Sequence, residues 1–584
     1  MKKIKIFLII VMATLCCSCN DFLTIYPENS ISSDEFLSSE KDLELYANGF
    51  LNAYLPNQNF VFSDQYTDYI ATVGSTAFLI ADAWRPEQQG GWGWGELRNI
   101  NWFLNNLHRA KDNVSPEIYN HYEGVGRFWR AYFYYDKVRT FGDVPWYDRV
   151  LEPDDEAQLY KPRDSREYVM DKVLEDLNFA AEYCSTNAVM TASSNRITRW
   201  VALAFKARIC LFEGTYRKYH TELNLTSSAE KFLREAVSAC EIVMRDGPYR
   251  LVTGGDVKKQ YRSLFISANL NTTEVILGRT YKEGVSMHEL TWMSFTAAGS
   301  SRWSLIKQFV NQYLMLDGSR FTDQTGYETM SYTNEFTNRD NRLAQTVIAP
   351  DYVRKLGGVD NRPYAPRFNV TLTGYQLIKW GLDDDKYDSQ YISYNSLPIL
   401  RYAEVLLSYA EAKAELGEMD ETVWNQTIRL LRERAGVNGA VPATHDPYLA
   451  TYYLNQTTDK WILEIRRERA IELCYEWVRY DDLMRWKMGK LIEMPWYGIY
   501  IGAKDTPYDL NSDGITDLTI SDSGSGGSDR IVIGDAYQLT EGNRGYLVYG
   551  APINRMWTDR KYLHPIPTGA IQINPALGQN PGWE

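Results

Sequence analysis

The sequence predicts a mainly α protein, in which tetratricopeptide-like helix pairs form a scaffold that carries a loop-rich, irregular lobe containing short strands. Apolar residues recur at helical spacing in segments that follow one another in pairs. Between these segments lie long stretches in which Gly, Asn, Thr and aromatic residues increase and the periodicity fades. The chain of 584 residues is also larger than one hydrophobic core usually supports, which agrees with a scaffold of repeated units.

Helices are expected wherever the apolar spacing is bounded by Gly, Pro, Ser or Asn. The segments are 43–54, 97–110, 128–141, 166–184, 197–216, 229–244, 401–416 and 423–435. Gly417 is placed to cap the seventh segment. We expect about four helix pairs, because each unit of such a scaffold buries its apolar face only against its neighbours. The scaffold should therefore lie mainly in residues 38–246 and 396–436.

The loop-rich lobe is expected mainly in residues 247–395 and 437–584. Long irregular stretches are unusual in a compact domain and are commonly functional. One strand-like run occurs at 274–277. No sharp domain boundary is visible, so scaffold and lobe are treated as one mature unit.

The N-terminal residues have the composition of an export signal that ends at a lipid-attachment cysteine. A start with three lysines precedes apolar residues 6–15, and the segment LCCSC places Ser18 before Cys19. The apolar run is too short to span a bilayer. We expect residues 1–18 to be a lipoprotein signal peptide and Cys19 of the mature chain 19–584 to be acylated. The alternative is a plain secretory signal with incidental cysteines.

Composition and motifs argue against several classes of function. The formal net charge is −13 and no Lys/Arg block occurs, so nucleic-acid binding is not expected. The catalytic motifs HExxH and GxSxG are both missing. Aromatic residues make up 14% of the chain, most of them Tyr and Trp, which suit wet, amphipathic binding surfaces. Binding without catalysis is therefore expected, although two distant carboxylates for glycoside hydrolysis remain an alternative.

One segment, RFWRAYFYYDKVRTFGDVP at 127–145, resembles the signature helix and GDVP turn of the SusD/RagB family of nutrient-binding lipoproteins from Bacteroidetes outer membranes. Four further segments resemble the family in the same order. They are 195–214, 397–417, 464–486 and 562–583. The mature start, CNDFLTIYP at 19–27, is also similar, so the resemblance covers essentially the whole mature chain.

The resemblance implies a lipid-anchored protein of the outer membrane that faces the cell exterior. Such a protein binds a nutrient, here an oligo- or polysaccharide, and delivers it to a SusC-like TonB-dependent barrel on which it acts as a hinged lid. Its partners would be that barrel, the glycan, and membrane lipid through acylated Cys19. It would be no enzyme and would require no cofactor. A peptide-binding member with a deep apolar groove, a surface glycoside hydrolase and a purely structural lid remain alternatives.

Charged residues of the segment 464–486 are interpreted as structural. Opposite charges three residues apart on a helix can pair, and with Trp477 and Trp486 nearby we expect a partly buried ion-pair network. The same interpretation applies to three residues of the earlier motif. The residues concerned are Glu464, Arg467, Arg469, Glu472, Glu476, Arg479, Arg401, Glu404 and Glu411.

The ligand site is expected in two loop regions, which the resemblance also implies. Binding residues concentrate on loops held by a rigid scaffold, and sugars stack their C–H faces on aromatic rings while neighbouring polar groups bond the hydroxyls. The candidates are Asp82, Trp84, Arg85, Trp92, Tyr281, Trp292 and Trp303. Trp94 opens a predicted helix, so packing is the favoured role for that ring.

A possible structural calcium site is the segment DLNSDGITD at 509–517, which follows the pattern of a short calcium loop. The expected ligands are Asp509, Asn511, Asp513, the Ile515 carbonyl and Asp517. The twelfth position is Ile520 instead of an acid, so the segment is not a complete EF-hand. A plain turn rich in Asp and Asn is the alternative.

Overall fold

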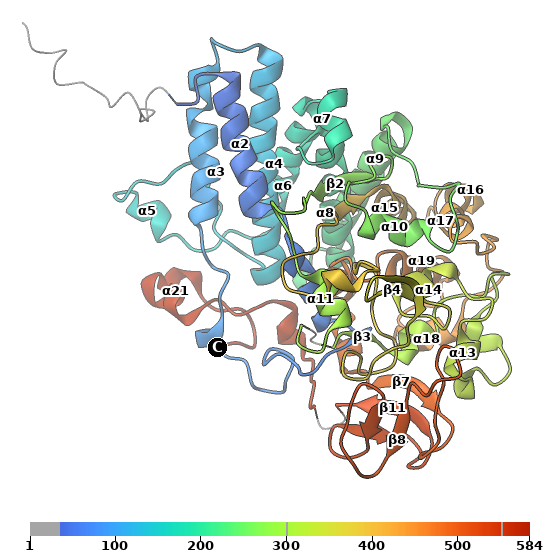
Figure 1. Ribbon diagram of the computed structural model, residues 1–584. Coiled ribbons are helices and arrows are strands. Elements are labelled where there is room, and N and C mark those ends of the chain that lie inside the picture. Colours follow the sequence, from blue (N-terminus) through green and yellow to red (C-terminus); the bar gives the residue numbers. More distant parts are fainter. Residues whose placement is uncertain (1–35, 300–301, 551–552) are drawn as a thin grey trace, which may run out of the picture.

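Packed helices form one side of the molecule, and a lobe of loops and short strands forms the other (Figure 1). The computed structural model describes residues 36–299, 302–550 and 553–584. The signal peptide, Cys19 and the segment 19–27 lie outside these residues. Within the part of the chain that is described, no helix is both long enough and apolar enough to cross a bilayer.

The six helices expected in the first half are confirmed. They are α2 (Glu40–Tyr54), α3 (Gly95–Asn106), α4 (Pro116–Phe141), α6 (Arg166–Tyr183), α8 (Arg199–Tyr219) and α9 (Ala229–Asp246). Helix α4 packs against α6, and α8 packs against α9. Helix α4 begins 12 residues earlier than 128, and Gly126 lies in this added part. A Cβ atom on Gly126 would lie 2.6 Å from Leu104, so the glycine permits close helix packing.

The later scaffold helices lie between residues 402 and 485. They are α15 (Tyr402–Glu415), α16 (Glu421–Gln426), α17 (Ile428–Arg434), α19 (Lys460–Glu472) and α20 (Arg479–Arg485). Gly417 has a φ of +74°, as expected for the residue that follows a helix C-terminus. The single helix expected at 423–435 is two helices, because the backbone of Thr427 leaves the helical region.

Helices α19 and α20 extend the scaffold into residues that were assigned to the lobe. Helix α19 packs against α15 and α17, and α20 packs against α8. The predicted lobe segment 437–584 therefore contains scaffold elements. Apolar periodicity did not reveal α19, because many of its buried residues are charged and need ion pairs to be buried.

Short strands and short helices build the lobe. The strands are β1 (Ile70–Ala71), β2 (Val275–Arg279), β3 (Ser304–Leu305), β4 (Val353–Leu356), β5 (Val359–Pro363), β6 (Leu397–Arg401), β7 (Trp496–Ile501), β8 (Thr519–Ser521), β9 (Arg530–Val532), β10 (Tyr537–Leu539) and β11 (Gly545–Tyr549). The strand-like run at 274–277 corresponds to β2, which pairs antiparallel with β6 and so connects the lobe to the start of α15.

Three strands form one antiparallel sheet in the order β10-β11-β7. Short helices lie between the strands and scaffold helices. They are α5 (Glu156–Leu159), α7 (Ala188–Ser193), α10 (Gln260–Ile266), α11 (Leu290–Phe295), α12 (Lys307–Val310), α13 (Tyr332–Glu335), α14 (Asn341–Thr346), α18 (Pro447–Tyr452) and α21 (Thr568–Ile573). Their brevity leaves the lobe held mainly by side-chain packing and hydrogen bonds.

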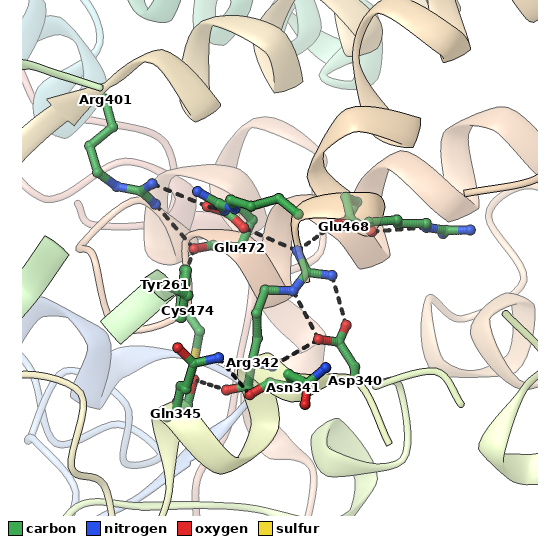
Figure 2. A network of polar contacts seen from close by, with 12 residues as sticks. Tyr261, Asp340, Asn341, Arg342, Gln345, Arg401, Glu468, Glu472 and Cys474 are labelled. Carbon is green, nitrogen blue, oxygen red and sulfur yellow. Dashed lines mark hydrogen bonds and ion pairs between the residues drawn. The ribbon is translucent and has the colours of Figure 1, made fainter. Parts of the chain in front are cut away.

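A buried ion-pair network joins lobe and scaffold at α19 (Figure 2). Glu472 accepts hydrogen bonds from Arg342 of α14 at 3.0 Å and from Arg401 at 3.1 Å, and it also pairs with Arg434. Glu468 pairs with Arg342 as well. Burial alone would raise the pKa of Glu472, but the three arginines hold it well below its usual value. The expected network is confirmed, and its members are fully rather than partly buried.

Asp64 is a buried carboxyl of η1 (Gln58–Tyr66), and no salt bridge to it is formed in the described residues. Its Oδ2 accepts hydrogen bonds from the Tyr69 hydroxyl at 3.1 Å and from the Trp477 amide at 3.4 Å. Burial raises the pKa of Asp64 to about 7, although both hydrogen bonds act to lower it. The folded protein therefore keeps a proton on Asp64 that the unfolded chain releases above pH 3.8.

We predict that this proton makes stability depend on pH. The contribution of Asp64 is fully present below about pH 4 and is lost as pH rises through about 7. Asp64→Asn keeps a neutral group and removes this loss. In urea unfolding, the stability of the variant relative to wild type should rise by about 2–3 kcal/mol between pH 5 and pH 8. Asp112→Asn, at an exposed carboxyl, should show no such change.

Three buried histidines change the stability with pH in the opposite direction to Asp64, and their effect is removed by comparing wild type with the variant. Burial lowers the pKa of His121, His288 and His564 to about 4, so stability from these neutral rings is lost as pH falls below about 6.5. They affect wild type and variant equally and cancel in the difference. A wild type and an Asp64→Asn variant with parallel pH profiles would show that Asp64 is already ionised in the folded protein.

Candidate functional site

A cavity of about 440 Å³ lies where the start of α3, the turn after α4 and α21 meet. Trp92 is the one predicted ligand residue in its lining. The walls are mostly apolar. They include Trp94, Leu97, Tyr147, Leu151, Ile573 and Leu577. Segments from three distant parts of the chain therefore create a single concave surface, as is common for binding sites.

Aromatic rings make up one wall of this cavity. The Trp92 ring stands nearly perpendicular to the rings of Trp94 and Phe141, with centroids 5.4 Å and 5.0 Å away. The Trp94 ring meets Tyr147 in the same edge-to-face manner at 5.7 Å. Such contacts hold the rings in defined orientations. The Lys137 ammonium also donates a hydrogen bond to the Gly91 carbonyl, which fixes the loop that carries Trp92.

A few polar groups accompany the aromatic wall. Asn101 of α3 is buried, and its Nδ2 donates to the carbonyls of Tyr147 at 3.0 Å and Arg149 at 3.2 Å. Its Oδ1 has no hydrogen-bond partner within the described residues. Arg98 donates to the Leu151 carbonyl at 2.9 Å. An apolar, aromatic cavity with few polar groups suits a ligand that has apolar faces and hydroxyl or amide edges.

Asp82, Trp84 and Arg85 lie outside this cavity, next to the C-terminal segment. Asp82 is exposed and forms a salt bridge to Arg560 at 3.2 Å. Trp84 is half-buried and donates from its indole nitrogen to Gln89 at 3.1 Å, while Arg85 is exposed. These three residues are accessible at one edge of the loop, so a ligand role for them stays a prediction.

The three candidates of the lobe differ in their exposure. Tyr281 is half-buried, with its ring centroid 4.7 Å from that of His288. Trp292 is half-buried on α11 and packs over Gly299, where a Cβ atom would lie 2.3 Å from the ring. Trp303 is only 7% exposed and packs in the core of the lobe. Trp303 therefore departs from the expected exposed platform, because its ring packs edge-on against Tyr475, with ring centroids 5.9 Å apart, inside this core.

The seven candidates do not form one cluster among the described side chains. Trp92 packs with the core of the helical scaffold, Trp84 with a cluster near the C-terminus, and the other three aromatics with the core of the lobe. Sequence reasoning missed the contribution of Asn101, Tyr147 and Leu577 to the cavity. The PWYDR segment at 145–149 was expected in the scaffold and the NPAL segment at 574–577 in the lobe, and only the folded chain places both beside Trp92.

In the segment 509–517, acidic side chains close a turn on the backbone. Asp509 accepts from the Gly514 amide, Asp513 from the Ile515 amide and Asp517 from the Leu510 amide, each at 2.8 Å. Burial raises the pKa of Asp517, and the charges of Asp513 and Asp509 raise it further. No group of three or more His, Cys, Asp or Glu side chains in the described residues is arranged to hold a metal ion. Calcium binding by this loop stays a prediction.

Comparisons with known proteins agree with this architecture. Residues 273–583 match the SusD family, and residues 21–211 match a family described as starch-binding and associating with the outer membrane. The first match spans more than half of the chain, so this chain belongs to the SusD family.

Similar proteins cover nearly the whole length. A SusD-like protein of Formosa agariphila is 27% identical over an alignment of 525 positions, which covers 83% of this chain and 92% of that protein. A second one from the same organism is 23% identical over an alignment of 524 positions, which covers 85% of this chain and 93% of that protein.

Two solved structures from Bacteroides fragilis share the fold. A SusD-like protein has a TM-score of 0.69 and 19% identity, with coverage of 95% of this chain and 100% of its own. A SusD-like carbohydrate-binding protein has a TM-score of 0.67 and 20% identity, with coverage of 93% and 99%. The mainly α, tetratricopeptide-like fold expected from the sequence is confirmed.

We predict that calcium, if it binds, replaces the backbone as the partner of the acidic side chains. Calorimetry with calcium should then show saturable binding to wild type that is lost in Asp513→Ala, because ligation relieves the repulsion between the carboxylates. Asp522→Ala, at an exposed carboxylate paired with Lys504, is the matched control and should bind normally. An absence of both heat and a shift in melting temperature would leave only a turn.

Proposed function

We propose that this protein is a non-catalytic surface lipoprotein that binds a glycan and delivers it to a SusC-like TonB-dependent transporter of the outer membrane. Membership in the SusD family is the observation that carries this proposal. The matches to a starch-binding family associating with the outer membrane, and to a carbohydrate-binding protein of the same fold, support the glycan as ligand.

The cavity at Trp92 offers chemistry that suits a sugar. A pyranose ring has an apolar C–H face that stacks on an indole, and its hydroxyls need donors and acceptors nearby. Trp92 and Trp94 supply the rings, while Arg98 and the amide of Asn101 supply polar groups beside them. Asp82, Trp84, Arg85, Tyr281 and Trp292 would contact parts of a longer chain. Trp303 has a packing role in this proposal.

A peptide is the second candidate ligand, and the apolar character of the cavity favours it. Leu151, Leu159, Ile573 and Leu577 also line the cavity, and Ile573 is 72% exposed. Aliphatic walls of this kind accept a hydrophobic side chain. Comparing oligosaccharides with peptides in one binding assay separates the two candidates.

We predict that Trp92 contributes to glycan binding, whereas Trp303 contributes to the stability of the fold. Trp92→Ala should weaken glycan binding about thirtyfold, which is about 2 kcal/mol, as for an aromatic residue at the centre of a binding site. Trp303→Ala should instead lower the melting temperature and leave the affinity of the remaining folded protein unchanged, because its ring is in the core. The measurements are affinity electrophoresis in gels that contain amylopectin, xylan or laminarin, and thermal unfolding.

The same assay tests the wider site. Trp84→Ala and Trp292→Ala should each weaken binding of a long chain by less than Trp92→Ala does. If Trp84→Ala, Trp92→Ala and Trp292→Ala all bind the cognate glycan normally, the ligand site lies elsewhere on the molecule. Binding of peptides but of no glycan would favour the second candidate.

We predict that Cys19 anchors the protein beside its transporter. Wild type should incorporate labelled fatty acid, fractionate with the outer membrane and copurify in mild detergent with a large TonB-dependent barrel. Cys19→Ala should lose the label and leave the membrane fraction, because the acyl chains supply the anchor. Ser18→Ala retains a small residue before the cysteine and is the control. A membrane-bound, acylated Cys19→Ala protein, or wild type that copurifies with no barrel, would contradict this part of the proposal.

A further inference from the structure

A second aromatic surface lies on the sheet β10-β11-β7, far from the cavity at α21 (Figure 1). Ile499 of β7 and Leu547 of β11 are buried on one side of the sheet, and a bulge in β7 between Tyr497 and Tyr500 interrupts the simple alternation of side chains. Tyr497, Tyr500 and Tyr546 point to the other side and are half-exposed. We call these three residues the tyrosine face.

The strand register brings the three rings together. Tyr500 pairs with Tyr546, and Tyr497 pairs with Val548 beyond a bulge in β7. The rings of Tyr497 and Tyr546 are stacked, with centroids 5.7 Å apart and an angle of 14° between their planes. The Tyr500 ring stands edge-on to Tyr546 at 5.9 Å. None of the three hydroxyls has a hydrogen-bond partner within the described residues.

Tyr448 of α18 belongs to the same neighbourhood. Burial raises the pKa of the Tyr448 hydroxyl, and the hydroxyls of Tyr327 and Tyr546 raise it further. Tyr327 starts η7 (Tyr327–Thr329), which packs against β7. Tyrosines from three elements therefore surround the outer side of this sheet.

Unsatisfied amide groups lie beside Tyr448 and the start of β7. Gln308 donates from Nε2 to the carbonyl of Pro495, the residue before β7, and its Oε1 is buried without a partner. Asn311 is 7% exposed, its Nδ2 faces the Tyr448 hydroxyl at 3.5 Å, and its Oδ1 also lacks a partner among the described residues. A buried oxygen without a donor is costly, and both oxygens are buried, so their expected partner is an ordered water below the surface.

The chemistry of the surface favours a carbohydrate over other occupants. Tyrosine rings offer apolar faces and polar tips with little loss of side-chain entropy on binding. The charged pair beside them, Arg544 with Glu541, is neutral overall, and the nearby Glu328 carboxylate adds a negative charge, so an anionic partner is disfavoured. Val548 is the one aliphatic residue on this side of β7 and β11, so an apolar helix would find little to pack against.

We propose that the tyrosine face is a second carbohydrate-binding surface, which holds another segment of the glycan chain that binds at the candidate site. The proposal rests on the proposed function, since it assumes a glycan ligand. When one glycan chain contacts both surfaces, the overall affinity rises, because the second binding event becomes intramolecular. An oligosaccharide of a few sugars reaches only one site and gains nothing from the second.

The test compares polymer with oligomer on variants of the full mature protein. Tyr497→Leu combined with Tyr546→Leu removes both stacked rings and keeps residues that strands tolerate. Tyr497→Phe combined with Tyr546→Phe retains the rings and removes only the hydroxyls. Tyr168→Leu, at a 46% exposed tyrosine on α6, is the matched control. The probes are amylopectin with maltoheptaose, xylan with xylohexaose and laminarin with laminarihexaose, and circular dichroism checks the fold of every variant.

The double leucine variant should bind the retained polymer about tenfold more weakly than wild type, with unchanged affinity for its oligomer. The affinity of the phenylalanine variant for the polymer should lie between those of the leucine variant and wild type. The affinity of Tyr168→Leu should match wild type. A folded leucine variant with wild-type affinity for the polymer would overturn the second surface, while loss of binding in Trp92→Ala would show that the proposed function still holds. If wild type binds none of the polymers, both proposals fail for these glycans.

Discussion

Helix α19 is the element on which the rest of the structure depends, because it carries charge into the core. Six of its buried residues are charged, namely Glu464, Arg466, Arg467, Glu468, Arg469 and Glu472. A buried charge that loses its partner destabilises a protein by several kcal/mol, so the five of these side chains that form ion pairs restrict where a partner segment can lie. Arg466 instead lies over the rings of Tyr219, Tyr453 and Trp486. Arg342 and Asp446 come from the lobe side, whereas Arg401 and Arg432 come from the scaffold. The network therefore aligns the two halves of the molecule.

The candidate cavity shows how such a rigid scaffold creates a site from separate segments. Gly142 ends α4 with a φ of +75°, a conformation that glycine adopts readily, and the chain then turns toward α3. Asn580 donates to the carbonyls of Phe141 at 2.9 Å and His564 at 2.7 Å, so the C-terminal segment is held against the end of α4. Ile573 and Leu577 thereby cover the cavity beside Trp92. Family-like motifs that contain no expected ligand residue thus shape the candidate site.

Sequence reasoning succeeded where the pattern is local. Amphipathic spacing identified α2, α3, α6, α8 and α9, since a surface helix must turn one apolar stripe toward its neighbours. Apolar spacing did not identify α19 as a scaffold helix, because the buried face of α19 is charged and lacks an apolar stripe. The sequence also did not predict which single aromatic rings are exposed. Trp92 and Trp303 occur in similar loop sequences, yet one lines a cavity and the other is in the core.

The sequence by itself determined the family, the helical scaffold, the charged network of α19 and the expectation of an export signal, because these depend on residue types at fixed local spacing. Tertiary structure alone decided which aromatics are accessible and which distant segments meet. The cavity needs contacts among α3, the turn after α4 and α21, and the tyrosine face needs the register of β7 against β11. Both depend on long-range packing, in which a ring is exposed or buried according to residues hundreds of positions away, and no local pattern records that outcome.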